Sequence, residues 1–238
     1  MSRTIKGILA LFPSTVKQGW KQHDNGKGWV KTSAYVEPSA YIEGIVYGNA
    51  RVYGNAWVNG DAQVYGDARV YGNARVSGNA WVYGDAQVSG DAQVSGDAQV
   101  YGNARVSGNA WVNGDARVYG NAWVSGNAQV YGDARVYGNA RVSGNAWVYG
   151  DARVNGDAQV SGDAQVSGDA WKTSPLYIQG SKHPATNTKR GSIAIGCEIH
   201  TFAEWLKNYK IIGKAAGYTP KQIKEYKAII DLFIKIGR

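Results

Sequence analysis

The chain has 238 residues, a formal net charge of +8, 32 glycines and a single cysteine. This glycine content is too high for a helical protein, and one cysteine excludes a framework of disulfides within the chain. The length would suit one or two ordinary domains, but most of the glycines recur at a fixed interval, which indicates a repeat protein.

Residues 1–29 are predicted to form an N-terminal cap. Their apolar run, residues 7–12, is too short to span a membrane and lacks a cleavage site of small residues. We therefore expect no signal peptide and no membrane partner. An incomplete first coil should follow from residue 30. The step from Ile42 to Val46 is two residues shorter than the later period, so the register should slip there.

Between residues 46 and 171 the phrase V-x-G-[N/D]-A-x occurs 21 times without an insertion or deletion. A unit this short cannot bury its apolar face alone and must stack on its neighbours. Alternation along A-x-V-x places Ala and Val on one side and the variable residues on the other. Gly followed by Asn or Asp tolerates the left-handed backbone of a tight turn. Each unit is therefore predicted to form a short strand and a corner, with Val and Ala inside.

The outward residues repeat every 18 residues, or three units, which predicts a triangular coil. Along one edge the residue after Val is almost always tyrosine, along the second it is mostly serine, and one corner is mainly aspartate. Like residues should stack as ladders, with a rise of about 4.8 Å per coil. The tyrosine column is Tyr47, Tyr65, Tyr83, Tyr101, Tyr119 and Tyr137, and the acidic column includes Asp97, Asp115, Asp133, Asp151 and Asp169. Stacked carboxylates would repel by about 1 kcal/mol each in water, so we expect corner amides, or alternatively cations, to offset the repulsion.

This repeat resembles the hexapeptide-repeat family of parallel β-helices, in which an aliphatic and a small residue fill a triangular interior. The resemblance covers about half of the chain and implies a left-handed coil. We therefore predict an all-β solenoid: a triangular left-handed parallel β-helix with 18 residues per coil and a small α-helical C-terminal cap. It should span residues 30–171 and be regular from residue 46.

Residues 172–200 are predicted to form a hairpin or linker, and residues 201–238 a two-helix region. The stretch from Thr201 to Glu204 is a capping box, so one helix should start near Phe202 and run to about Ala216. Pro220 should open the second helix. The pair would cover the end of the prism or contact another subunit. The terminal I-G-C-x-x-H-T stretch with two helices resembles a group of phage- and prophage-encoded proteins, which implies a virion-associated or cytoplasmic setting and no particular reaction.

The hexapeptide-repeat family, which this repeat resembles, includes acyltransferases and γ-class carbonic anhydrases that use histidines from their coils. No histidine of this chain lies between residues 46 and 171, so we expect no enzyme, no catalytic residue and no cofactor. A diverged acyltransferase is the least favoured alternative. Cys197 and His200 have the spacing of half a zinc site, which His183 could join, but a fourth ligand is missing. A buried thiol and a histidine before a helix cap are the favoured interpretation.

Outward aromatic and arginine side chains are the candidate binding residues. Tyr and Arg without Lys are typical of a protein–protein interface, so we expect a rigid scaffold or binding protein that forms a homo-oligomer, with a trimer favoured. The candidates are Tyr65, Tyr83, Tyr101, Tyr119, Tyr137, Arg117, Arg135, Arg153, Trp111 and Trp147. A glycan, small-anion or nucleotide site at a subunit junction is the alternative, and another virion or host protein could also bind. The acidic solenoid, with 11 Asp against 8 Arg, disfavours nucleic acid.

Overall fold

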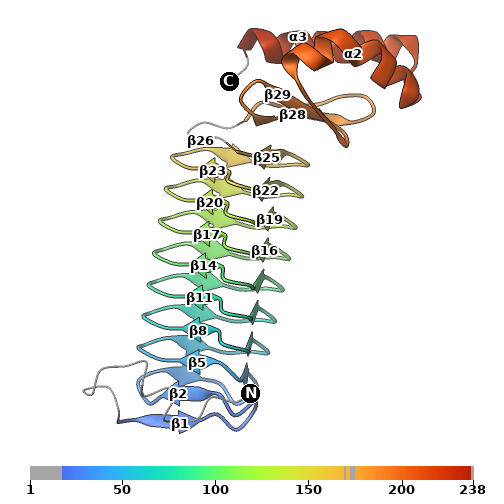
Figure 1. The fold of residues 1–238 in the computed structure, drawn as a ribbon. Helices are drawn as coiled ribbons and strands as arrows, with labels where there is room; N and C mark the ends of the chain where they lie inside the picture. The colour runs from blue at the N-terminus through green and yellow to red at the C-terminus, as the bar shows by residue number, and fades with distance from the viewer. Residues whose placement is uncertain (1–17, 169, 172–174, 237–238) are drawn as a thin grey trace.

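A computed structural model describes residues 18–168, 170–171 and 175–236. The chain forms a straight stack of coils, with a small sheet and two helices at its C-terminal end (Figure 1). The predicted β-solenoid, its period of about 18 residues and the two C-terminal helices are confirmed.

Three sheets form the sides of the coil. Within each, the strands that follow the first coil pair in parallel with partners 18 residues apart, except for the last pair of sheet A, where the separation is 17. Sheet A contains β1 (Trp20–Gln22), β2 (Trp29–Lys31), β5 (Ile45–Val46), β8 (Gln63–Val64), β11 (Trp81–Val82), β14 (Gln99–Val100), β17 (Arg117–Val118), β20 (Arg135–Val136), β23 (Arg153–Val154) and β26 (Ala170–Trp171). Sheet B contains β3 (Tyr35–Val36), β6 (Arg51–Val52), β9 (Arg69–Val70), β12 (Gln87–Val88), β15 (Arg105–Val106), β18 (Trp123–Val124), β21 (Arg141–Val142) and β24 (Gln159–Val160). Sheet C contains β4 (Tyr41–Ile42), β7 (Trp57–Val58), β10 (Arg75–Val76), β13 (Gln93–Val94), β16 (Trp111–Val112), β19 (Gln129–Val130), β22 (Trp147–Tyr149) and β25 (Gln165–Ser167).

The interior of the solenoid consists of stacked valines and alanines. Every repeat valine from Val46 to Val166, and every repeat alanine from Ala50 to Ala164, is at most 1% exposed. The predicted inward positions are therefore confirmed. Each buried valine contributes about 1.5–3 kcal/mol before conformational entropy is subtracted.

Main-chain hydrogen bonds join each coil to the next along both the strands and the corners. In one unit the amide of Arg105 donates to Ala122 O at 2.9 Å, and the amide of Ser107 donates to Val124 O at 2.9 Å. At the corner, the amide of Asn109 donates to Gly126 O at 2.8 Å. Because many of the corners are bonded as well as the strands, consecutive coils are joined at several points around the perimeter.

The corner glycines are required for two reasons. Their φ angles lie between 58° and 72°, a region that residues with a Cβ rarely adopt. In addition, from Gly48 to Gly144, a Cβ would lie only 2.8–3.2 Å from the main chain of the glycine one coil further on. Glycine is therefore selected both by backbone conformation and by the close approach of consecutive coils.

The asparagines that follow these glycines form side-chain ladders with a direction. Asn103 Nδ2 donates to Asn121 Oδ1 at 3.2 Å, and Asn121 donates in the same way to Asn139 at 3.1 Å. Asn139 in turn donates to Asp157 Oδ1 at 3.0 Å. The ladder ends at Asp157 because a carboxylate accepts hydrogen bonds but has no proton to donate onward.

The predicted register slip in the first coil is confirmed. Val30 pairs with Val46, a separation of 16 residues, whereas Val46 pairs with Val64, a separation of 18. Glycines allow the shortened corner to pack, since a Cβ on Gly44 would lie 2.4 Å from Ala62 O. The antiparallel pair of β1 and β2 then covers the N-terminal edge of sheet A.

Sheet D closes the opposite end of the solenoid. It is antiparallel and contains β27 (Tyr177–Gln179), β28 (Pro184–Lys189), β29 (Ser192–Ile195) and β30 (Glu198–Thr201). The predicted hairpin is its central pair, β28 and β29, while the two flanking strands were not predicted. Strand β28 packs on β25 of the last coils.

The two helices pack on the far side of sheet D from the coils (Figure 1). They are α2 (Phe202–Ala215) and α3 (Pro220–Ile236), and the predicted capping box is formed, with Thr201 accepting from the Glu204 amide. One expectation is corrected here, because sheet D rather than the helix pair lies against the end of the prism. No helix in the described part of the chain is long and apolar enough to cross a membrane.

Candidate functional site

The predicted tyrosine column forms a continuous stack of rings along one edge of the solenoid. Successive ring centroids are 4.7–4.9 Å apart and the ring planes lie within 7° of parallel. Trp20 lies against the ring of Tyr47 at one end, and Asn155 Nδ2 donates to the Tyr137 hydroxyl at the other. Because the rings cover one another, the column offers hydroxyl edges to a ligand and no open ring faces for a sugar or base to stack on.

Packing changes the acidity of these phenols. Burial, and secondarily the neighbouring Tyr83, raises the pKa of Tyr65 to about 12. Burial also raises the pKa of Tyr47, Tyr101 and Tyr119, in each case with a smaller contribution from an adjacent tyrosine. The stack therefore favours the neutral, protonated phenols.

We expect stability to fall as the pH rises from about 10, the pKa of a free phenol, through the raised values of the folded protein. In this window the folded chain retains protons that the unfolded chain releases, so deprotonation favours unfolding. Thermal unfolding measured between pH 9 and about 12, together with the ultraviolet absorbance of tyrosinate, would check this. Ionisation of the whole tyrosine population near pH 10, without loss of stability, would contradict it.

Arginines stand beside the tyrosine stack, as the sequence predicts. Arg117, Arg135 and Arg153 are direct partners in neighbouring strands of sheet A. The positive charges of Arg135 and Arg117 lower the pKa of Tyr119 and so partly offset the rise that burial causes. Each of these arginines lies two residues after an aspartate of the acidic column, so a row of positive charges runs beside a row of negative ones.

The acidic column shows a different arrangement from the one expected. The corner amide of Asp97 donates to Gly114 O of the next coil, and therefore is not directed at a carboxylate. Asp97 itself accepts from Asn79, at 2.9 Å. Within the described residues, no group of three metal-binding side chains gathers at these corners. The described aspartates of the column from Asp97 to Asp151 are exposed.

Sheet C has the most aromatic residues at the outward positions of its strands. Trp57, Trp111 and Trp147 project from it and remain 43%, 46% and 40% exposed. Trp57 stacks on Tyr41 with centroids 4.8 Å apart, and the guanidinium of Arg75 lies 5.5 Å from its centre. Arg75 is the single charged residue among the outward strand positions, which are Tyr41, Trp57, Arg75, Gln93, Trp111, Gln129, Trp147 and Gln165.

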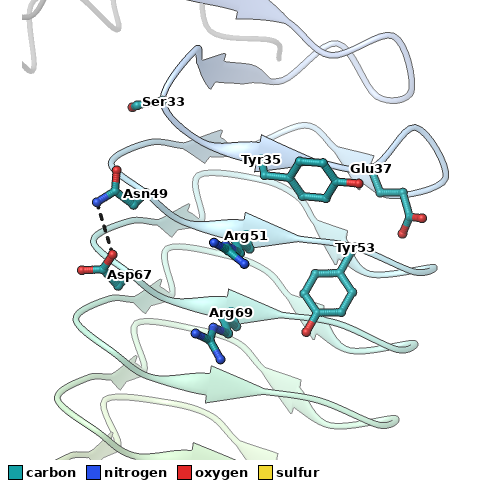
Figure 2. A pocket seen from close by; sticks show the side chains of 8 residues that line it. All are labelled: Ser33, Tyr35, Glu37, Asn49, Arg51, Tyr53, Asp67 and Arg69. Atoms are coloured by element: carbon teal, nitrogen blue, oxygen red, sulfur yellow. Dashed lines mark hydrogen bonds between the residues drawn. The ribbon is translucent and has the colours of Figure 1, made fainter.

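Sheet B carries a concave surface at its N-terminal end that sequence reasoning did not single out (Figure 2). Its volume is about 850 Å³. Arg51 and Arg69 form the floor, between a wall of polar corner residues and a wall that includes Tyr53. The lining residues are Ser33, Tyr35, Glu37, Asn49, Arg51, Tyr53, Asp67 and Arg69.

The position of this concave surface follows from one change in the repeat. After the valines of sheet B the outward residue is tyrosine at Tyr53 and Tyr71, whose rings stack at 5.0 Å, and serine in the later coils. The tall wall therefore exists only at the start of the sheet. The signal was visible as two tyrosines heading a serine column, but the depth of the surface depends on side-chain packing.

The C-terminal cysteine and histidines are not brought together as a metal site. The ring of His200 contacts Glu198 Oε2 at 3.1 Å and lies edge-on to Trp205. His183 and the exposed Cys197 instead line a small apolar cavity of about 80 Å³ between sheet D and the helices. Among the residues the structure describes, no three histidine, cysteine or acidic side chains could hold a metal.

Part of the chain is similar to a known family of repeats. The family described as YdcK Beta solenoid repeat matches the chain over residues 46–60, 62–76, 68–84, 74–90, 98–114, 116–132, 128–144, 134–150 and 146–162. All of these segments lie within the regular coils. No curated protein matches the chain.

Proposed function

Because much of the regular coil region matches the family described as YdcK Beta solenoid repeat, we propose that this chain is a rigid, non-enzymatic scaffold that presents repeated side chains to partners. The main support is the hydrogen bonding between coils, which joins every pair of neighbouring strands in the regular stack and many of the corners. The interior contains only Val and Ala from residue 46 to 166, so chemical diversity is confined to the outside.

The scaffold proposal includes a homotrimer formed through the outward surface of sheet C. Interfaces are rich in aromatic residues and poor in charge at their centre, and this surface has three exposed tryptophans and one arginine. Sheets A and B each carry more arginines on their outward strand positions. Copies of the same solenoid also share one rise per coil, so equivalent coils can meet in register along the whole side.

The chain's own repeat supplies mild substitutions to test the trimer. Gln93 and Gln129 occupy the positions directly before and after Trp111 in sheet C, so Trp111→Gln and Trp147→Gln should leave the coils intact. We expect the unmodified protein to have three times the mass of the 25.6 kDa chain by light scattering, and the double variant to be monomeric.

Trp123→Gln is the matched control, because Trp123 is 42% exposed but projects from sheet B. It should leave the trimer unchanged. A monomeric unmodified protein, or equal effects of all three substitutions, would exclude sheet C as the interface. X-ray scattering on the same samples should still give a rod, which tests the scaffold separately from its assembly.

The setting of this scaffold is also part of the proposal. The resemblance of the C-terminal region to phage- and prophage-encoded proteins favours an accessory or structural role in a virion, or in the cytoplasm of its host. The absence of histidine from the repeat supports a non-enzymatic role.

A further inference from the structure

The concave surface at the start of sheet B has the features of a site for an anionic ligand (Figure 2). Arg51 and Arg69 are direct partners in the parallel strands β6 and β9, so their main chains are about 4.8 Å apart. Two guanidinium groups in this arrangement can converge on one oxyanion, and each can donate two parallel hydrogen bonds to it.

The lining holds two carboxylates beside the two arginines, but neither carboxylate is hydrogen-bonded to a guanidinium. Glu37 Oε2 accepts from the Gly54 amide at 2.5 Å, and Asp67 Oδ1 accepts from Asn49 Nδ2 at 3.2 Å. Within the described residues, no hydrogen bond or salt bridge engages either guanidinium. The N–H donors of both guanidinium groups therefore remain available to a ligand.

The arginines of sheet A lie beside more acidic residues. Arg117, Arg135 and Arg153 each follow an aspartate by two residues, whereas Arg51 follows the neutral Asn49 and Arg69 follows Asp67. In sheet B the arginine pair is confined to the first regular coils, since the later Arg105 and Arg141 have no arginine as a strand partner.

Aromatic side chains in the lining indicate what kind of group accompanies the anion in the ligand. Tyr35 lies on β3, the edge strand of sheet B, is 57% exposed and has no ring partner among the described residues. Tyr53 stacks with Tyr71, and it shares the wall of the site with Glu37 (Figure 2). Tyrosine rings with an open face suit the apolar face of a sugar, and polar groups such as Ser33 and Asn49 on the opposite wall can bond hydroxyls.

We propose that this surface binds an acidic sugar. Arg51 and Arg69 hold its carboxylate or phosphate, and the sugar ring lies against Tyr35 and Tyr53. This ligand site lies on a different side of the solenoid from the tryptophans of sheet C, so it does not depend on the assembly proposed above.

Titration calorimetry with the full-length protein tests the proposal with four probes: glucuronate, glucose 6-phosphate, glucose and inorganic phosphate. We expect at least one of the two acidic sugars to bind and glucose not to bind. Binding of glucuronate would indicate that the site recognises a carboxylate, and binding of glucose 6-phosphate would indicate that it recognises a phosphate. Arg51→Gln and Arg69→Gln should each weaken binding by about tenfold or more, since charge-assisted pairs are the strong ones.

The controls again come from the repeat. Gln87 occupies the next position along the same column, so the glutamine variants should fold normally. Arg105→Gln, in the same sheet but outside the site, should bind like the unmodified protein. Tyr53→Ser introduces the serine that the later coils have at this position. It should weaken binding of the sugar while leaving thermal stability nearly unchanged. Failure of both acidic sugars to bind, equal affinity for inorganic phosphate, or equal loss in Arg105→Gln would overturn the proposal.

Discussion

Replacing Gly144 with alanine is expected to destabilise the solenoid by about 2–5 kcal/mol. The φ angle of Gly144 is 69°, and a residue with a Cβ in this left-handed region costs about 1–2 kcal/mol. The new Cβ would also lie 2.8 Å from Gly162 N of the next coil, and displacing that main chain costs about 1–3 kcal/mol more. Urea unfolding followed by circular dichroism measures the sum.

Gly150→Ala separates the two contributions. Its φ angle is 59°, but a Cβ there would meet no atom within 4 Å. This variant should therefore lose only the conformational part, about 1–2 kcal/mol. If the two substitutions reduce the free energy of unfolding equally, the close approach between coils at Gly144 does not contribute to the requirement for glycine there.

Removing one hydroxyl from α3 is expected to loosen the C-terminal cap by about 2–4 kcal/mol. The Tyr226 hydroxyl donates to His183 O at 2.7 Å, and accepts from the amides of His183 at 2.6 Å and Lys182 at 3.0 Å. Tyr226 is only 3% exposed, so Tyr226→Phe leaves main-chain groups without partners in a largely water-free position. Hydrogen exchange of the cap amides, with thermal unfolding, would record the loss.

Tyr209→Phe is the control on the neighbouring helix. Tyr209 contacts Lys210 and Lys227 through its ring, and no hydrogen bond to its hydroxyl occurs among the described residues. The change should stay within about 0.5 kcal/mol. Comparable losses from both variants would show that the Tyr226 hydroxyl does not tie the β27–β28 loop to α3.

The sequence was sufficient to predict the coil because interior and corner positions are fixed by strict local rules. Val, Ala and Gly recur without a gap, and each has one physical reason for its position. The 18-residue phasing of outward tyrosines also predicted correctly which residues stack, from Tyr47 to Tyr137. The slip after Ile42 was visible as a missing pair of residues.

Other features depended on packing that no local pattern records. The face-to-face geometry of the tyrosines, which covers their rings, is decided by side-chain rotation at a fixed spacing. The concave surface of sheet B needed both Tyr53 and the paired arginines to be placed in three dimensions. Strands β27 and β30 were missed because Tyr177–Gln179 and Glu198–Thr201 are short and only partly buried, so they lack alternation.

The register of 18 residues also limits how a gene for such a rod can change in length. An in-frame duplication of 18 codons adds one coil, roughly 4.8 Å of rod, and keeps every side-chain column aligned. A duplication of six codons would preserve the buried Val and Ala but turn all later coils by one side, so tyrosines would continue into the serine column. Length variants that keep a binding surface are therefore expected to differ by whole coils.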